Sequence, residues 1–216
     1  MENHDGKWKL NGWIDADKIT HKGWDNLCLN PRAVNLIEKN LDKISQNGWN
    51  NLCHNKNATH LIEKNLDKIS QKGWDDLCRY SSGFIFHLVE NNVEKISQNG
   101  WHCLCRNVCA GHIIEKNLNK LDYQCWEILC DYSIYMSYND NKIINIIENN
   151  LDKFTPQAWV NLCRNHKAIH IIKNNLDKLT PPAWDELLKN TEIFVQDTLK
   201  RKLCDDDDDN DNDVNV

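Results

Sequence analysis

The sequence has no long apolar stretch of the kind that places a chain in a membrane. A membrane-spanning helix needs about eighteen consecutive apolar residues, and no apolar run in this sequence approaches that length. Residues 1–9, MENHDGKWK, also lack the apolar centre of a signal peptide. We therefore expect a soluble, cytoplasmic protein that makes no membrane contact.

The sequence also lacks the short motifs that mark common active sites. It contains no Gly-rich phosphate loop, no G-x-S-x-G and no H-E-x-x-H. Since no motif supports catalysis, we expect a non-enzymatic protein that uses no cofactor.

What the sequence does contain is a unit of about 25 residues, built around Trp-x-x-Leu-Cys, that recurs seven times. The tryptophans stand at positions 24, 49, 74, 101, 126, 159 and 184. A fixed period of this kind is typical of stacked-repeat proteins, in which each unit buries its apolar face against its neighbours. The units cover 16–40, 41–65, 66–92, 93–117, 118–150, 151–175 and the truncated 176–190.

Each unit opens with the start signals of a helix, which we name helix A. A residue able to cap a helix stands four positions before each tryptophan, and an apolar residue precedes it, as a hydrophobic staple requires. Pro156 and Pro181 occupy the first helical position, where proline is favoured. The spacing predicts a helix of about ten residues with Trp, Leu and Cys on one face. The caps are Thr20, Ser45, Ser70, Ser97, Asp122, Thr155 and Thr180.

A second apolar run in each unit predicts a second helix, helix B. In the second unit its apolar residues stand at positions 58, 61, 62, 66 and 69, a helical spacing. We expect helix B to end near a recurring asparagine in the left-handed conformation, which asparagine tolerates. These residues are Asn40, Asn65, Asn117, Asn150 and Asn175.

The predicted fold class is all-α, an α-solenoid of about seven 25-residue helix-turn-helix repeats with N- and C-terminal caps. Residues 1–15, with Trp8 and Trp13, form the N-terminal cap, and 16–190 the helical repeat domain. Residues 191–204 are predicted to form a C-terminal capping helix, with 205–216 as a disordered acidic tail. The tail holds seven of the 32 acidic residues, so the remaining chain is close to neutral. A solubilising role and an interaction with a basic partner are both open for it.

Ten cysteines raise the question of disulfides. Six of them occupy the same position, four residues after the tryptophan, and Leu188 stands there in the seventh unit. A position that accepts Cys or Leu belongs to the core, so we expect reduced, buried thiols. The six are Cys28, Cys53, Cys78, Cys105, Cys130 and Cys163.

A zinc-binding structural protein is an alternative, because Cys103, Cys105, Cys109 and His112 stand close together in the fourth unit. The spacing disfavours it, since Cys103 and Cys105 face different sides of a helix. A series of histidines at one position of helix B alternates with asparagine, which indicates a shared hydrogen-bonding role. It comprises His60, His87, His112 and His170, with Asn35 and Asn145 in other units.

Two units carry insertions, and both lie between helix A and helix B. The third unit gains two residues at 80–83 and the fifth gains eight within 132–141. Insertions at the same point of a repeat emerge on the same edge of the solenoid. Clustered tyrosines with a nearby methionine are typical of protein-binding surfaces. For the longer insertion, in the fifth unit, the alternative is that helix A runs longer there. The candidate partner-binding residues are Tyr80, Tyr132, Tyr135, Met136 and Tyr138.

Single-stranded RNA is the other candidate partner, because helix-pair repeats can bind it one base per repeat. Arg79, Arg106 and Arg164 share the position after the core cysteine, but Leu29 and Asp131 occupy it in other units. Since the basic row is interrupted and residues 1–204 are nearly neutral, the expected affinity for phosphate is weak. We therefore expect a protein partner of unknown identity.

The repeating I-S-Q-N-G-W-N-N-L-C-H-N-K-N-A-T-H-L-I-E-K-N-L-D-K-I, rich in Asn, Ile and Lys, resembles the short helical repeats of proteins from giant DNA viruses of amoebae, the mimivirus-like group. The resemblance covers about 16–190, although the core cysteine and the 25-residue period differ from that family. It implies an accessory viral protein acting in host cytoplasm or packaged in the particle. The function expected is a non-enzymatic scaffold for protein–protein interaction.

Overall fold

The computed structural model describes residues 8–80, 86–131 and 141–195. Over these residues the chain is all-helical, with short α helices and 3₁₀ helices that pack on their neighbours and no β-strand. No helix in this part of the chain is long and apolar enough to span a bilayer.

Helix A of each unit begins where its cap residue predicts. Six of the seven cap side chains accept a backbone N–H group from the first turn, whereas Thr180 makes no such bond. The staple is visible where Phe154 packs edge-on against Trp159, with ring centroids 5.4 Å apart. The A helices are α1 (His21–Leu27), α3 (Gln46–Leu52), α5 (Gln71–Tyr80), α7 (Gln98–Cys105), α9 (Tyr123–Cys130), α11 (Pro156–Cys163) and α13 (Pro181–Leu187).

Helix B is shorter than its apolar pattern suggests, because the recurring asparagine ends it. The predicted left-handed conformation is wrong, since Asn65 has φ −135° and ψ 39°. Its side-chain Nδ2 instead donates to the Leu61 carbonyl 2.8 Å away, one of the carbonyls that a helix end leaves without a partner. Asn40, Asn92, Asn117, Asn150 and Asn175 make the same bond. The B helices are α2 (Val34–Glu38), α4 (Thr59–Lys64), α6 (Phe86–Glu90), α8 (Gly111–Lys116), α10 (Asn141–Glu148) and α12 (Ile169–Lys173).

A 3₁₀ turn, which the sequence analysis does not anticipate, links each helix B to the next helix A. Leu66 lies in such a turn, and Ile69 follows it with an extended backbone, so the apolar spacing across them does not belong to helix B. These turns are η2 (Leu41–Lys43), η4 (Leu66–Lys68), η6 (Val93–Lys95), η7 (Leu118–Lys120), η9 (Leu151–Lys153) and η11 (Leu176–Lys178). Further 3₁₀ turns are η1 (Ala16–Lys18), η3 (Lys56–Ala58), η10 (His166–Ala168) and η12 (Thr191–Ile193).

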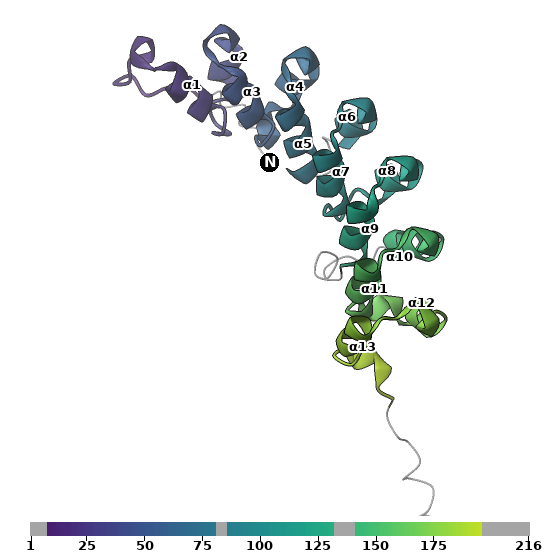
Figure 1. Ribbon diagram of the computed structural model, residues 1–216. Helices are drawn as coiled ribbons and strands as arrows, with labels where there is room; N and C mark the ends of the chain where they lie inside the picture. Colours follow the sequence, from purple (N-terminus) through teal and green to yellow (C-terminus); the bar gives the residue numbers. More distant parts are fainter. Residues whose placement is uncertain (1–7, 81–85, 132–140, 196–216) are drawn as a thin grey trace, which may run out of the picture.

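The helices follow one another along a curved row. Figure 1 shows the A helices on the inner side of the curve and the B helices on the outer side. The A helices pack on one another in succession, from α1 on α3 to α11 on α13, and B helices such as α6 and α8 pack against the A helix before them.

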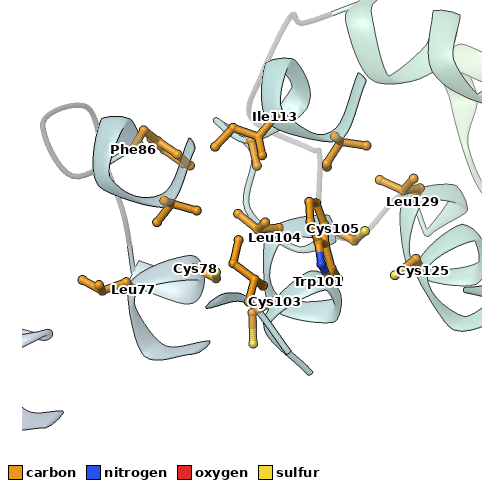
Figure 2. Close-up of a cluster of buried hydrophobic side chains, with 14 of the residues drawn as sticks. Leu77, Cys78, Phe86, Trp101, Cys103, Leu104, Cys105, Ile113, Cys125 and Leu129 are labelled. Carbon is orange, nitrogen blue, oxygen red and sulfur yellow. The ribbon is translucent and has the colours of Figure 1, made fainter. Parts of the chain in front are cut away.

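The core lies between the two rows of helices, and the repeated cysteines belong to it. Figure 2 shows the core around α7, where Trp101, Leu104 and Cys105 lie beneath helix B. Burial raises the pKa of the Cys28 and Cys53 thiols to about 12. Among the described residues no cysteine forms a disulfide, which confirms the predicted reduced thiols there.

The two ends of the row differ from their predicted caps. Trp8 lies under the Arg32 guanidinium, 4.2 Å from ring centroid to Cζ, whereas Trp13 is 80% exposed and covers nothing. At the other end Phe194 has an extended backbone directly after η12, so an α helix does not begin at 191. The rest of the predicted capping helix, 196–204, and the acidic tail, 205–216, lie outside the described residues.

Candidate functional site

Polar side chains on the A helices join each unit to the next. In five of the units, the residue after the tryptophan contacts the cap residue of the following helix A and so anchors that cap. Ser45 donates its hydroxyl to Asp25 over 2.6 Å, and Thr155 donates to Glu127 over 2.7 Å. The other pairs are Asn50 with Ser70, Asp75 with Ser97 and His102 with Asp122. These polar residues are therefore structural.

Buried asparagines, which the sequence analysis missed, form a second set of bonds between units. Asn55 and Asn190 donate from Nδ2 to the carbonyls of Cys28 and Cys163, at 2.8 Å and 2.9 Å. The sequence does carry a pattern that could have predicted these bonds, because asparagine recurs two residues after the core cysteine position in several units. No buried side-chain nitrogen or oxygen atom within the described ranges is left without a hydrogen-bond partner.

The histidines of helix B pair with glutamates of the preceding helix B. His87 Nε2 lies 2.9 Å from Glu63 Oε1, and His112 Nε2 lies 3.6 Å from Glu90 Oε2. His60 with Glu38 and His170 with Glu148 repeat this pairing at 3.8 Å. Only the His87–Glu63 pair is within hydrogen-bond distance, so the predicted hydrogen-bonding role holds for that histidine, whereas the other three pairs are longer charge contacts between neighbouring B helices.

The arginines after the core cysteines are engaged in contacts within the chain. Arg106 donates to the His102 carbonyl over 3.1 Å, and Arg164 Nε lies 2.9 Å from Glu186 Oε2. Hydrogen bonds from Arg164, and then from Lys189, lower the pKa of Glu186 to about 2. An arginine held by a carboxylate is less able to bind phosphate, so the Arg164–Glu186 pair weakens the nucleic-acid alternative.

The candidate tyrosines lie at or beyond the ends of described helices. Tyr80 is the last residue of α5, and Tyr132, Tyr135, Met136 and Tyr138 lie outside the described residues.

The backbone just before the insertion differs between the third and the fifth unit. In the third unit, α5 has ten residues, so helix A does run longer there. In the fifth unit, α9 ends at Cys130 and Asp131 has an extended backbone, so the longer insertion does not continue helix A.

An open hollow on the helix-A side borders the longer insertion. We name it the helix-A hollow; it contains Asp131, the last described residue before the insertion. Its lining mixes a cationic residue, Arg106, with the carboxylates of Glu127 and Asp131, a mixture that suits a protein surface better than a phosphate backbone. The lining residues are His102, Arg106, Gln124, Glu127, Ile128, Asp131 and Asn161, from α7, α9, α11 and Asp131.

One group of side chains in the described ranges combines three metal-ligand types. His102, Asp122 and Cys125 each place a ligand atom within 4.8 Å of the others. The zinc ligands considered from sequence do not meet in this way. Cys103 Sγ accepts from Arg79 at 3.5 Å and His112 faces Glu90, and in Figure 2 the Cys103 and Cys105 thiols point in different directions.

Comparison with known proteins found no match to this chain. No family model matches the chain, and neither the curated proteins nor the solved structures contain a match.

Proposed function

We propose that this chain is a helical-repeat solenoid that binds a protein partner through the helix-A hollow and the adjoining insertion. The repeated bonds between neighbouring units support the solenoid. The cap-anchoring bond that Ser45 donates to Asp25 recurs one unit later, where Ser70 donates to Asn50. In a solenoid, each unit contacts only its neighbours, so its stability depends on bonds of this kind between adjacent units.

The position of the hollow is the observation that carries the binding proposal. A scaffold repeats its interior and varies the surface that recognises a partner, and the fifth unit departs most from the repeat. Its insertion starts at the rim of the helix-A hollow, next to Asp131. Exposed Arg106 and Gln124 offer polar contacts there, and the tyrosines of the insertion would add the aromatic contacts typical of binding hot spots.

The resemblance to giant-virus repeat proteins extends this proposal to an accessory role in the cytoplasm of a host cell or in a virus particle. Single-stranded RNA remains the alternative ligand. The proposal favours protein because Arg164 is paired with Glu186, and because Leu29 and Asp131 interrupt the row of arginines.

Charge changes in the hollow test the proposal. Three proteins are compared by quantitative capture from lysate with and without nuclease treatment. They are the full-length wild type, the hollow variant Arg106→Glu with Gln124→Arg, and a matched control on the outer row, Lys173→Glu with Asn174→Arg. The proposal expects specific proteins retained by the wild type and the control but lost by the hollow variant. Equal capture by all three proteins would exclude the hollow, and loss of every specific partner on nuclease treatment would favour RNA.

A further inference from the structure

Three departures from the repeat consensus fall at the boundary between the fourth and fifth units. The residue before the tryptophan is glycine or alanine in six units but Cys125 in the fifth. The helix-A cap is serine or threonine in six units but Asp122 in the fifth. The residue after the tryptophan is Asp, Asn, Glu or Val in six units but His102 in the fourth.

The fold brings these three positions together. Asp122 Oδ2 lies 3.0 Å from His102 Nε2, and Asp122 Oδ1 accepts the backbone N–H of Cys125 over 2.9 Å. Although burial acts in the opposite direction, the bonds from Cys125 and His102 hold the pKa of Asp122 below its usual value. His102 and Asp122 remain partly exposed, with 18% and 30% of their side-chain surfaces accessible, so an ion could reach them from the helix-A hollow.

A second thiol, that of Cys105, points toward the helix that carries Cys125 (Figure 2). In other units a Cβ at the position before the tryptophan would lie against the core cysteine of the preceding unit, 3.4 Å from Cys28 Sγ at Gly48. Cys125 stands at this position, and in Figure 2 Cys105 on α7 points toward α9, where Cys125 lies.

His102, Asp122 and Cys125 supply three donors to one metal ion, and Cys105, which lies outside that 4.8 Å group, supplies the fourth when its thiol turns toward them. Two sulfurs, an imidazole nitrogen and a carboxylate oxygen are the ligands that tetrahedral Zn²⁺ takes in proteins. Zinc bonds of about 2.0–2.3 Å place tetrahedral ligands about 3.3–3.8 Å apart. The three ligand atoms already within 4.8 Å of one another therefore need to move by only about 1 Å.

We propose that His102, Asp122, Cys125 and Cys105 form a zinc site that joins the fourth unit to the fifth. Binding converts two thiols and Zn²⁺ into a zinc dithiolate and releases two protons to solvent, with no change of oxidation state. Because the ligands come from α7, the cap of α9 and α9 itself, the ion would fasten two helices together beneath the helix-A hollow. The site does not depend on the proposed protein partner.

Cobalt binding by the full-length, reduced and metal-stripped protein tests this site. Co²⁺ replaces Zn²⁺ in tetrahedral sites and gives a near-ultraviolet charge-transfer band when thiolates bind it. We expect a single Co²⁺ per chain with this band, displaced by Zn²⁺. Cys125→Ala and Cys103→Asn are the matched variants, because each removes one thiol and introduces a residue found at that position in other units.

The expected result is that Cys125→Ala weakens Co²⁺ affinity at least about 100-fold, since loss of a direct ligand should exceed the 10–100-fold effect of an outer-shell change. Cys103→Asn should bind as the wild type does. Asp122→Ser, which restores the common cap, should also weaken binding while circular dichroism shows a folded chain. Absence of the thiolate band, or equal affinity in wild type and Cys125→Ala, would overturn the proposal and leave His102–Asp122 as one more cap-anchoring pair.

Discussion

Replacing a central tryptophan should cost far more stability than replacing the equivalent residue at the end of the row. Trp74 is 2% exposed between neighbouring units, whereas Trp184 in the last unit is 41% exposed. Truncating a buried tryptophan to alanine costs about 3–5 kcal/mol, because apolar contacts are lost and a cavity remains. Lys95 Nζ lies 5.1 Å from the Trp74 ring centroid and adds about 0.5–1 kcal/mol of cation–π attraction.

We therefore expect Trp74→Ala to lower the free energy of unfolding by about 3–5 kcal/mol and Trp184→Ala by about 1–2 kcal/mol. Equilibrium urea unfolding followed by circular dichroism measures both, since the helical signal does not depend on the tryptophan removed. Equal losses in the two variants would refute the reasoning, because they would mean that packing between units does not determine what the tryptophan contributes.

Two further predictions concern the polar bonds. Asn65→Ala removes the amide that satisfies the Leu61 carbonyl and should lower the free energy of unfolding by about 1–2 kcal/mol. Asn149→Ala removes the same kind of bond on the exposed surface and should cost less than about 0.5 kcal/mol in the same urea assay. A reversed order would contradict the role given to Asn65. The pKa of Glu186 is lowered to about 2, so its contribution to stability is complete above its ordinary value of 4.5 and is lost as the pH falls toward 2. A carboxyl NMR titration should give a midpoint of about 2 that rises in Arg164→Ala, and an unchanged midpoint in that variant would exclude the ion pair as the cause.

The starts of the A helices could be predicted from sequence because their signals are local. A cap such as Ser45 acts on the N–H groups of the next turn, and Pro156 fits the first helical position wherever the helix packs. The role of the repeated cysteine could also be predicted, because Leu188 at the equivalent position identifies a place that needs only an apolar side chain.

The ends of the B helices could not be predicted in the same way. Asparagine at a helix end can adopt the left-handed conformation or donate its amide to a carbonyl four residues earlier, and both leave the same sequence pattern. Asn65 takes the second course, and the 3₁₀ turn that follows removes Leu66 and Ile69 from the helix.

Contacts between units depend on stacking, which a single unit does not reveal. His102 and Asp122 are 20 residues apart and meet only because α7 packs on α9. The zinc candidates predicted from sequence are neighbours within the fourth unit, Cys103, Cys105, Cys109 and His112, whereas the fold brings Cys105 toward Cys125 of the fifth unit (Figure 2). Of the candidate partner-binding residues, only Tyr80 lies in a described helix, so the fold places the start of the longer insertion but not its tyrosines.

The most direct test of the binding proposal is site-specific photo-crosslinking from two positions of the same folded protein. A photoreactive residue at Gln124, on the helix-A hollow, is compared with one at Asn174, on the outer row, in lysate from the native cells. The account predicts a discrete, nuclease-resistant protein adduct from position 124 and none from position 174. The same adducts from both positions, or adducts that disappear with nuclease, would contradict a protein partner at the helix-A hollow.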